Sequence, residues 1–201
     1  MPTDITHARH VAVAAERVLS LTAAIDDSML DRPTPCDGME LAALLAHVDG
    51  LSQAFTAAAR KEFGPLTASP PDPVQSRLGA NWTDDLRSHV RGLADAWADP
   101  AAWQGMTQAG GVDLPAEVMG TVALSELVLH GWDISRSVSA TFDVPDEVLL
   151  TVYELHHPPE PQSEREGMFG PVVEVPEDAR LVDRLVGLAG RDPFWPHGSL
   201  S

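Results

Sequence analysis

Three residues of this 201-residue chain have the types and spacing of a metal site. Glu126 and His130 are four residues apart, so on a helix their side chains lie one turn apart on the same face. That face is otherwise apolar, and a carboxylate directed at a core is costly unless it is paired or bound to a cation. His47 occupies a similar apolar face on an earlier predicted helix. Together these side chains predict a binding site for a divalent metal ion.

The donor set indicates which metals the site would take. Imidazole nitrogens and carboxylate oxygens suit zinc, and also nickel, iron or manganese. Two histidines and one glutamate leave a position for water or substrate, which is the pattern of catalytic zinc sites. Asp133 is placed to orient His130 through its other ring nitrogen. Three alternatives stay open: His47 as a hydrogen-bonded core histidine, Glu126 as a helix-surface residue and Asp133 as a solvated one.

The elements that must position these residues are predicted from apolar spacing. Long helices are expected over 6–25, 39–63, 83–98 and 116–138, and shorter ones over 146–156 and 177–189. A long connection spans 64–82, and residues 103–116 form either a small hairpin or an irregular loop. This pattern predicts an all-α fold, a four-helix bundle with a crossover connection and additional C-terminal helices. We expect the bundle over 1–157 and a C-terminal extension packed on it over 158–201.

Other polar residues have simpler interpretations. His7 and His10, near the N-terminus, are expected at the surface. His156 and His157 precede a proline-rich break, which indicates a helix end, with one of them lining a cleft as the alternative. Cys36 is interpreted as a buried structural residue at a turn, with a reactive thiol as the alternative.

Composition limits the classes of partner and location. Thirteen basic and thirty acidic residues give a net charge of −17, which argues against nucleic acid and anionic membranes as partners. A single cysteine allows no intrachain disulfide, and the N-terminus lacks the pattern of a signal peptide. No apolar stretch is long enough to span a bilayer. A cytoplasmic location is therefore expected.

Three motifs resemble those of a known family. Residues 34–39, TPCDGM, followed by LLAH at 44–47, resemble the TPCPGW and LLxH signature of the mycothiol-dependent maleylpyruvate isomerase N-terminal domain, a member of the DinB-like superfamily. Residues 126–133, ELVLHGWD, resemble its later ExxxHGWD signature. Segments at 169–173, 181–185 and 190–193 are similar to the ending of short family members. Asp37 and Met39 replace the usual proline and tryptophan.

The resemblance implies that His47, Glu126 and His130 hold a divalent metal, usually zinc, whose open position binds and deprotonates a low-molecular-weight thiol of the mycothiol type. The thiolate would attack a small electrophilic substrate, giving isomerisation or S-transfer. The isomerase proper has a second, C-terminal domain that helps to build its active site. This chain is expected to be too short to carry that domain in full, and this argues against maleylpyruvate as its substrate.

The leading prediction is therefore a thiol-dependent transferase or isomerase-like enzyme. Two other classes stay open. One is a non-enzymatic metal- or ligand-binding module, favoured by a fourth protein ligand or a closed apolar core. The other is a structural bundle without metal. A homodimer through apolar loop residues such as Phe169 also stays open.

Overall fold

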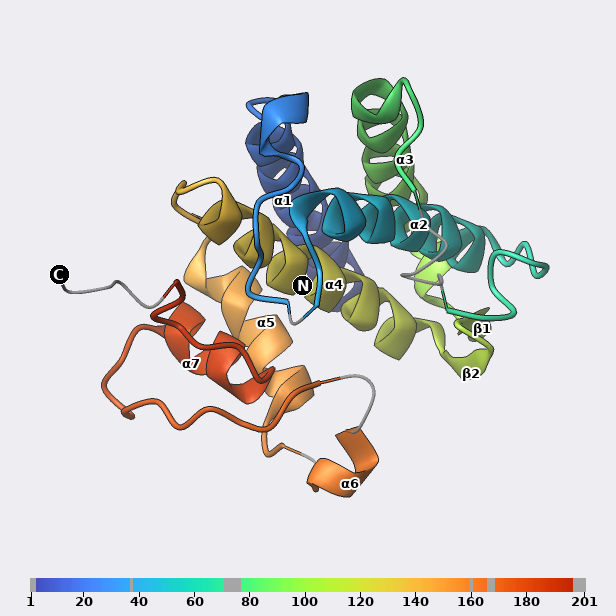
Figure 1. The fold of residues 1–201 in the computed structure, drawn as a ribbon. Helices are drawn as coiled ribbons and strands as arrows, with labels where there is room; N and C mark the ends of the chain where they lie inside the picture. Colours follow the sequence, from blue (N-terminus) through green and yellow to red (C-terminus); the bar gives the residue numbers. More distant parts are fainter. Residues whose placement is uncertain (1–2, 37, 71–76, 160, 166–168, 197–201) are drawn as a thin grey trace, which may run out of the picture.

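The described part of the chain is mostly helical, as predicted. The computed structural model describes residues 3–36, 38–70, 77–159, 161–165 and 169–196. The all-α class is confirmed, with one small two-stranded sheet (Figure 1). In chain order the elements are α1 (Thr3–Thr22), the 3-10 turn η1 (Asp27–Met29), α2 (Leu41–Arg60), α3 (Trp82–Trp97), the 3-10 turn η2 (Pro100–Trp103), β1 (Met106–Ala109), β2 (Val112–Pro115), α4 (Ala116–Ser137), α5 (Asp146–His156), α6 (Gln162–Arg165) and α7 (Leu181–Leu188).

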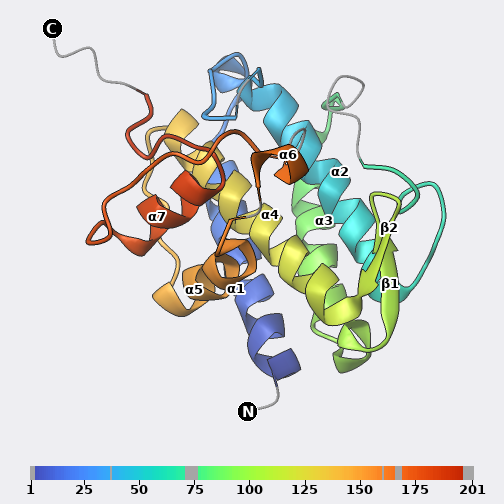
Figure 2. The ribbon, with the colours of Figure 1, turned by 90° about the horizontal axis from the view of Figure 1, so that it is seen from below.

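Four long helices share one core. Helix α2 packs against α3 and α4, and α1 packs against the same two helices. The pairs α1–α2 and α3–α4, which follow each other along the chain, therefore lie at opposite corners (Figures 1 and 2). Each long helix contributes fully buried apolar side chains to the core, among them Val18, Leu44, Trp97 and Leu124. This arrangement places a face of α2 against a face of α4.

Helix α3 shows how spacing and local chemistry produce these elements. Asp84 and Asp85 lie in its first turn, where their negative charges interact favourably with the positive end of the helix dipole. Its apolar residues recur at helical spacing and are buried, namely Leu86, Val90, Leu93 and Trp97. Helix α2 ends earlier than predicted because Lys61 adopts a left-handed conformation, with φ of 59°, and its N–H group caps the last turn.

A hairpin joins α3 to α4, which settles the open choice for this region in favour of a hairpin. Strands β1 and β2 are antiparallel, with Ala109 opposite Val112. Gly110 and Gly111, both at positive φ, form the two-residue turn. The hydroxyl group of Thr107 donates to the carbonyl oxygen of Ala58 at 2.5 Å and fixes the hairpin to the end of α2.

The C-terminal segment, defined here as residues 157–196 within the described ranges, covers one side of α4 and α5. Helix α5 packs on α4, and α7 packs on α5 (Figure 2). The last helix begins at Leu181, four residues later than predicted, because a turn closed by the Ala179 N–H and the Pro176 carbonyl precedes it. The boundary between bundle and extension stays a prediction.

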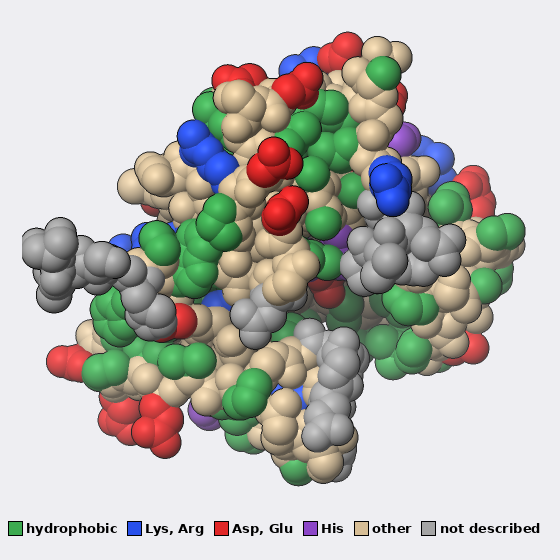
Figure 3. All heavy atoms as spheres, viewed as in Figure 1, with side chains coloured by type: hydrophobic (Ala, Val, Ile, Leu, Met, Phe, Trp, Pro, Cys, Tyr) green, Lys and Arg blue, Asp and Glu red, His purple; other side chains and the backbone are tan. Residues whose placement is uncertain are grey.

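The surface reflects the composition. Acidic side chains are spread over the visible face and do not gather in one patch (Figure 3). None of the helices within the described residues is both long and apolar enough to cross a membrane.

The packing of α4 against two tryptophans gives a stability prediction. A Cβ atom at Gly120 would lie 2.5 Å from the ring of Trp103 and 2.7 Å from that of Trp97. These rings contact each other edge to face and are buried, so they have little room to move. We expect Gly120→Ala to lower the free energy of unfolding by about 1–3 kcal/mol in urea denaturation.

The control is Gly92→Ala within α3, where the nearest neighbour, the Thr56 hydroxyl oxygen, lies 4.0 Å from the added carbon. This change removes a helix-interior glycine without a clash and should raise the free energy of unfolding by about 0.5–1 kcal/mol. Equal effects of the two substitutions would contradict the packing argument.

Candidate metal centre

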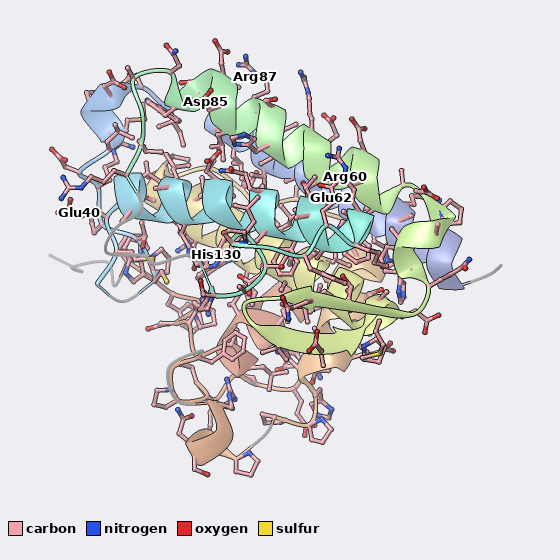
Figure 4. The ribbon with its side chains drawn as sticks, turned by 90° about the vertical axis from the view of Figure 1, so that its right-hand side faces the viewer. Glu40, Arg60, Glu62, Asp85, Arg87 and His130 are labelled. Carbon is pink, nitrogen blue, oxygen red and sulfur yellow. The ribbon has the colours of Figure 1, made fainter. Side chains whose placement is uncertain are left out.

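Helix α4 presents Glu126 and His130 to the same side. The spacing of four residues places the Nε2 atom of His130 3.0 Å from the Oε2 atom of Glu126. The His130 side chain is 7% exposed and the Glu126 side chain is 29% exposed, so the carboxylate lies at the edge of the core and not on the open surface. Figure 4 shows His130 in the interior, below α2 and toward the C-terminal segment.

His47 reaches the pair from α2. Because α2 packs against α4, the ring of His47 meets that of His130 edge to face, with centroids 5.1 Å apart and an interplanar angle of 88°. One ligand atom from each of His47, Glu126 and His130 lies within 4.8 Å of the others. The structure thus brings the three predicted residues together. That they hold a metal stays a prediction.

Asp133 supports His130 from the opposite side of the ring. Its Oδ2 atom lies 3.1 Å from the Nδ1 atom of His130, and its side chain is fully buried. The solvated alternative therefore does not describe Asp133. The same carboxylate accepts a hydrogen bond from the Nη2 atom of Arg191 at 3.1 Å. A buried carboxylate is stable here because two cationic partners share it.

These contacts set opposite protonation states for the two histidines. Burial alone lowers the pKa of His130, but hydrogen bonds to Asp133 and Glu126 outweigh burial and raise it to about 9. Burial, together with the neighbouring charge of His130, lowers the pKa of His47 to about 4. Without a metal, His130 is therefore an imidazolium and His47 a neutral imidazole near pH 7.

The two carboxyl groups stay ionised despite their surroundings. Burial on its own raises the pKa of Glu126, but the hydrogen bond to His130 brings it below its usual range. For Asp133, burial is likewise outweighed, chiefly by the charge of Arg191, and its pKa is also lowered. A cation bound at this centre would therefore meet carboxylates and not neutral acids.

The residues present fit a divalent metal ion. The Nδ1 atom of His47 is buried and has no hydrogen-bond partner among the described residues. An unpaired buried nitrogen is costly, and a cation that accepts its lone pair would remove that cost. Asp133 holds the proton on Nδ1 of His130, which leaves Nε2 as the ligand atom that faces Glu126. Nitrogen and carboxylate donors of this kind suit zinc.

Cys36 belongs to a second group of possible ligands, which shares only His130 with the first. It is half-buried, and its Sγ atom is within 4.8 Å of ligand atoms of His130 and Asp133. The hydroxyl oxygen of Thr34 accepts a hydrogen bond from the Cys36 N–H group at 3.2 Å and so shapes the turn. Asp37, the next residue of that motif, lies outside the described residues.

His156 is a polar neighbour that sequence reasoning did not assign to the site. Its Nε2 atom lies 2.7 Å from the hydroxyl oxygen of Ser125, next to Glu126 in the sequence. Burial lowers the pKa of His156, although the charge of Glu126 opposes this. A signal existed, because His156 continues the buried stripe of Val148 and Val152 on α5.

Arg191 and His10 were also missed. Arg191 had no local signal, since its partner Asp133 is far away in the sequence. The surface position expected for His10 is wrong: it is 5% exposed, and its Nδ1 atom lies 3.1 Å from the hydroxyl oxygen of Thr151. Helix α5 packs over α1 at this point and buries it.

The chain matches a known protein family over most of the bundle. The family described as the mycothiol maleylpyruvate isomerase N-terminal domain matches residues 11–135. The chain belongs to this family. The match includes His47, Glu126, His130 and Asp133, so the family predicted from the sequence motifs is confirmed.

Two crystal structures of a mycothiol-dependent maleylpyruvate isomerase, one of them a single-residue variant, have similar folds. The variant gives a TM-score of 0.58 at 18% sequence identity, and the other structure gives 0.55 at 21%. Each comparison covers 75% of this chain and 68% of the other. At this level of identity the similarity shows a shared fold. No protein of curated function matches the chain.

The protonation states predict how zinc binding depends on pH. Zinc takes the Nε2 lone pair of His130 only after a proton leaves the ring, whose pKa is about 9. His47, with a pKa of about 4, is already neutral in this pH range and offers a nitrogen lone pair without releasing a proton. We expect the zinc dissociation constant to fall by about tenfold for each pH unit between about pH 7 and 8.5.

The measurement is competition with a chelator whose own pH dependence is known. Histidines with ordinary pKa values near 6.5 would give a constant affinity in this range, because they are already neutral. A constant affinity would therefore contradict the raised pKa of His130.

Proposed function

We propose that this chain binds a divalent metal, zinc first among the candidates, and uses it as a thiol-dependent transferase or isomerase-like enzyme. The observation that carries the proposal is the convergence of His47, Glu126 and His130 within 4.8 Å. Family membership supports it, because the structurally similar isomerase is described as mycothiol-dependent. The proposed cosubstrate is a low-molecular-weight thiol of the mycothiol type, and the second substrate is a small electrophile.

The chain's residues divide the work of such a site. His47 and His130 would donate nitrogens and Glu126 an oxygen, while Asp133 holds the His130 ring by its Nδ1–H group. When bound, the metal lowers the pKa of a coordinating thiol and so provides a thiolate at neutral pH. His156, whose lowered pKa favours the neutral imidazole and which bonds to Ser125 beside Glu126, would accept the thiol proton.

An enzyme is favoured over a purely binding module by the ligand count. Within the described residues, the cluster formed by His47, Glu126 and His130 has three protein ligands, and zinc commonly takes four. Glu126 is 29% exposed, so the carboxylate side of the centre is not closed off by apolar packing. A remaining position that a small molecule can reach is the requirement for thiol activation.

The partners and location follow from the same proposal. A small thiol and a small electrophile are the proposed ligands, while the net charge of −17 disfavours nucleic acid and anionic membranes. A cytoplasmic location and a homodimer remain predictions.

Metal content tests the site directly. We expect protein purified without an affinity tag to hold about one zinc per chain, in line with a single three-ligand centre. The double variant His47→Ala, His130→Ala should hold almost none. Elemental analysis after dialysis provides the measurement, and circular dichroism checks that the fold is retained.

The matched control is His89→Ala on α3, where the Nδ1 atom of His89 lies 2.8 Å from an oxygen of Asp49, away from the centre. It should keep the zinc content of the unmodified protein. Equal metal content in the double variant and the control would refute the proposed site.

Turnover tests the enzyme proposal apart from metal binding. The zinc protein is mixed with mycothiol, or a soluble analogue of it, and a panel of electrophiles, and loss of free thiol is followed. We expect zinc-dependent thiol consumption with at least one electrophile, and its loss in the double variant, because the thiolate requires the metal. Zinc binding with no turnover, also after replacement by nickel or manganese, would favour the binding module.

A further inference from the structure

The family match ends at residue 135, yet side chains from beyond it reach the proposed metal centre. His156 bonds to Ser125 beside Glu126, and Arg191 bonds to Asp133 behind His130. Figures 1 and 2 show α7, and the chain that follows it, lying against the side of α4 and α5. Helix α5 and the C-terminal segment thus line the centre from a second side.

Arg191 makes the most direct of these contacts. Its Nη2 atom donates to Oδ2 of Asp133 at 3.1 Å, and its Nε atom lies 3.5 Å from Oδ1. The same Oδ2 atom lies 3.1 Å from Nδ1 of His130. Arg191 is 8% exposed and Asp133 is fully buried, so little water competes for this carboxylate. Two hydrogen bonds therefore connect the C-terminal segment to a predicted ligand histidine.

The backbone around Arg191 is shaped to hold it there. The Arg191 N–H group donates to the carbonyl oxygen of Val186, and Nη1 donates to that of Ala189, each at 2.9 Å. Gly190 precedes it with φ of 76°, and a Cβ atom at Gly190 would lie 2.6 Å from the carbonyl oxygen of Gly170. Only glycine fits this close crossing without strain. Helix α7 and the backbone at Gly170 together fix the direction of the Arg191 guanidinium group.

We propose that Arg191 is a positioning residue for the metal centre, so that docking of the C-terminal segment and metal binding are thermodynamically coupled. The inference rests on the proposed function. The carboxylate of Asp133 is kept facing His130 because it also accepts a hydrogen bond from Arg191. Without Arg191, Asp133 would lose the contact that fixes its carboxylate, and the Nδ1–H group of His130 would lose an acceptor held in one place. The Nε2 atom of His130 would then be directed less precisely at the metal position.

Coupling of this kind is reciprocal. If the docked segment improves metal affinity by some factor, the metal improves docking by the same factor. Mutating a carboxylate that bonds to a ligand histidine, or a partner of that carboxylate, typically weakens metal binding by about 10- to 100-fold. If Arg191 had only a structural role, replacing it would lower the stability of the protein. The zinc affinity, and the effect of zinc on docking of the C-terminal segment, would then stay unchanged.

The first test compares zinc affinity among matched variants by chelator competition. Arg191→Met keeps an unbranched side chain and removes the guanidinium group with its charge, and it should weaken zinc binding about 10- to 100-fold. Arg191→Lys should recover part of the loss. The control is Arg184→Met on α7, where Arg184 donates to the Tyr153 hydroxyl oxygen and has no contact with the centre among its described bonds. It should bind zinc like the unmodified protein.

The second test needs no variant and covers the case in which Arg191→Met does not fold. Hydrogen exchange of residues 181–196 is measured in the unmodified protein with and without zinc. We expect zinc to slow exchange in this segment, and the double variant His47→Ala, His130→Ala to show no zinc effect.

The outcomes separate this inference from the function on which it rests. Unmodified protein that binds zinc with no change in exchange, or Arg191→Met that binds zinc as tightly as unmodified protein, would overturn the coupling and leave the metal site intact. Unmodified protein that binds no zinc would overturn both.

Discussion

The centre depends on one buried imidazole held between two carboxylates. His130 lies between Glu126 and Asp133 on α4, and the two contacts at 3.0 and 3.1 Å fix its ring in one orientation. Where water is excluded, a row of hydrogen-bonded charged side chains is stable only when positive and negative charges balance. Arg191 supplies the balancing charge in the metal-free state, and a metal ion would supply more. The Arg191–Asp133 contact therefore links the position of the C-terminal segment to this balance of charge.

Helix α4 can hold Glu126, His130 and Asp133 largely away from bulk water because other elements enclose it. It packs against α1, α2 and α5, so three consecutive turns bury polar residues together with apolar ones. Close packing depends on small residues at the contacts: a Cβ atom at Gly131 would lie 2.7 Å from the ring of Phe142. A helix at the surface would have left Asp133 to water, and water would have replaced its hold on His130.

The three proposed ligand residues could be predicted from the sequence, but the residues that support them could not. Glu126 and His130 are readable because helical spacing puts them on one apolar face, and His47 stands out for the same reason. The family motifs pointed to the same three residues, and the bounds of α5 were predicted as the structure has them. Local signals of this kind need no knowledge of what packs where.

Other features depend instead on which helix covers which face. These are the contacts of Arg191 and His156 and the burial of His10. Arg191 contacts Asp133 across more than fifty residues of chain, a pairing that no periodicity encodes. The proposed ligands and the residues that contact their neighbours therefore come from different parts of the chain. His47, Glu126 and His130 lie within the family domain, while Arg191 and His156 lie beyond it. If the proposed metal site is correct, a change in the C-terminal segment would alter metal affinity without replacing a proposed ligand. In a family whose N-terminal domain is shared, that separation provides a physical route to different substrates on one metal centre.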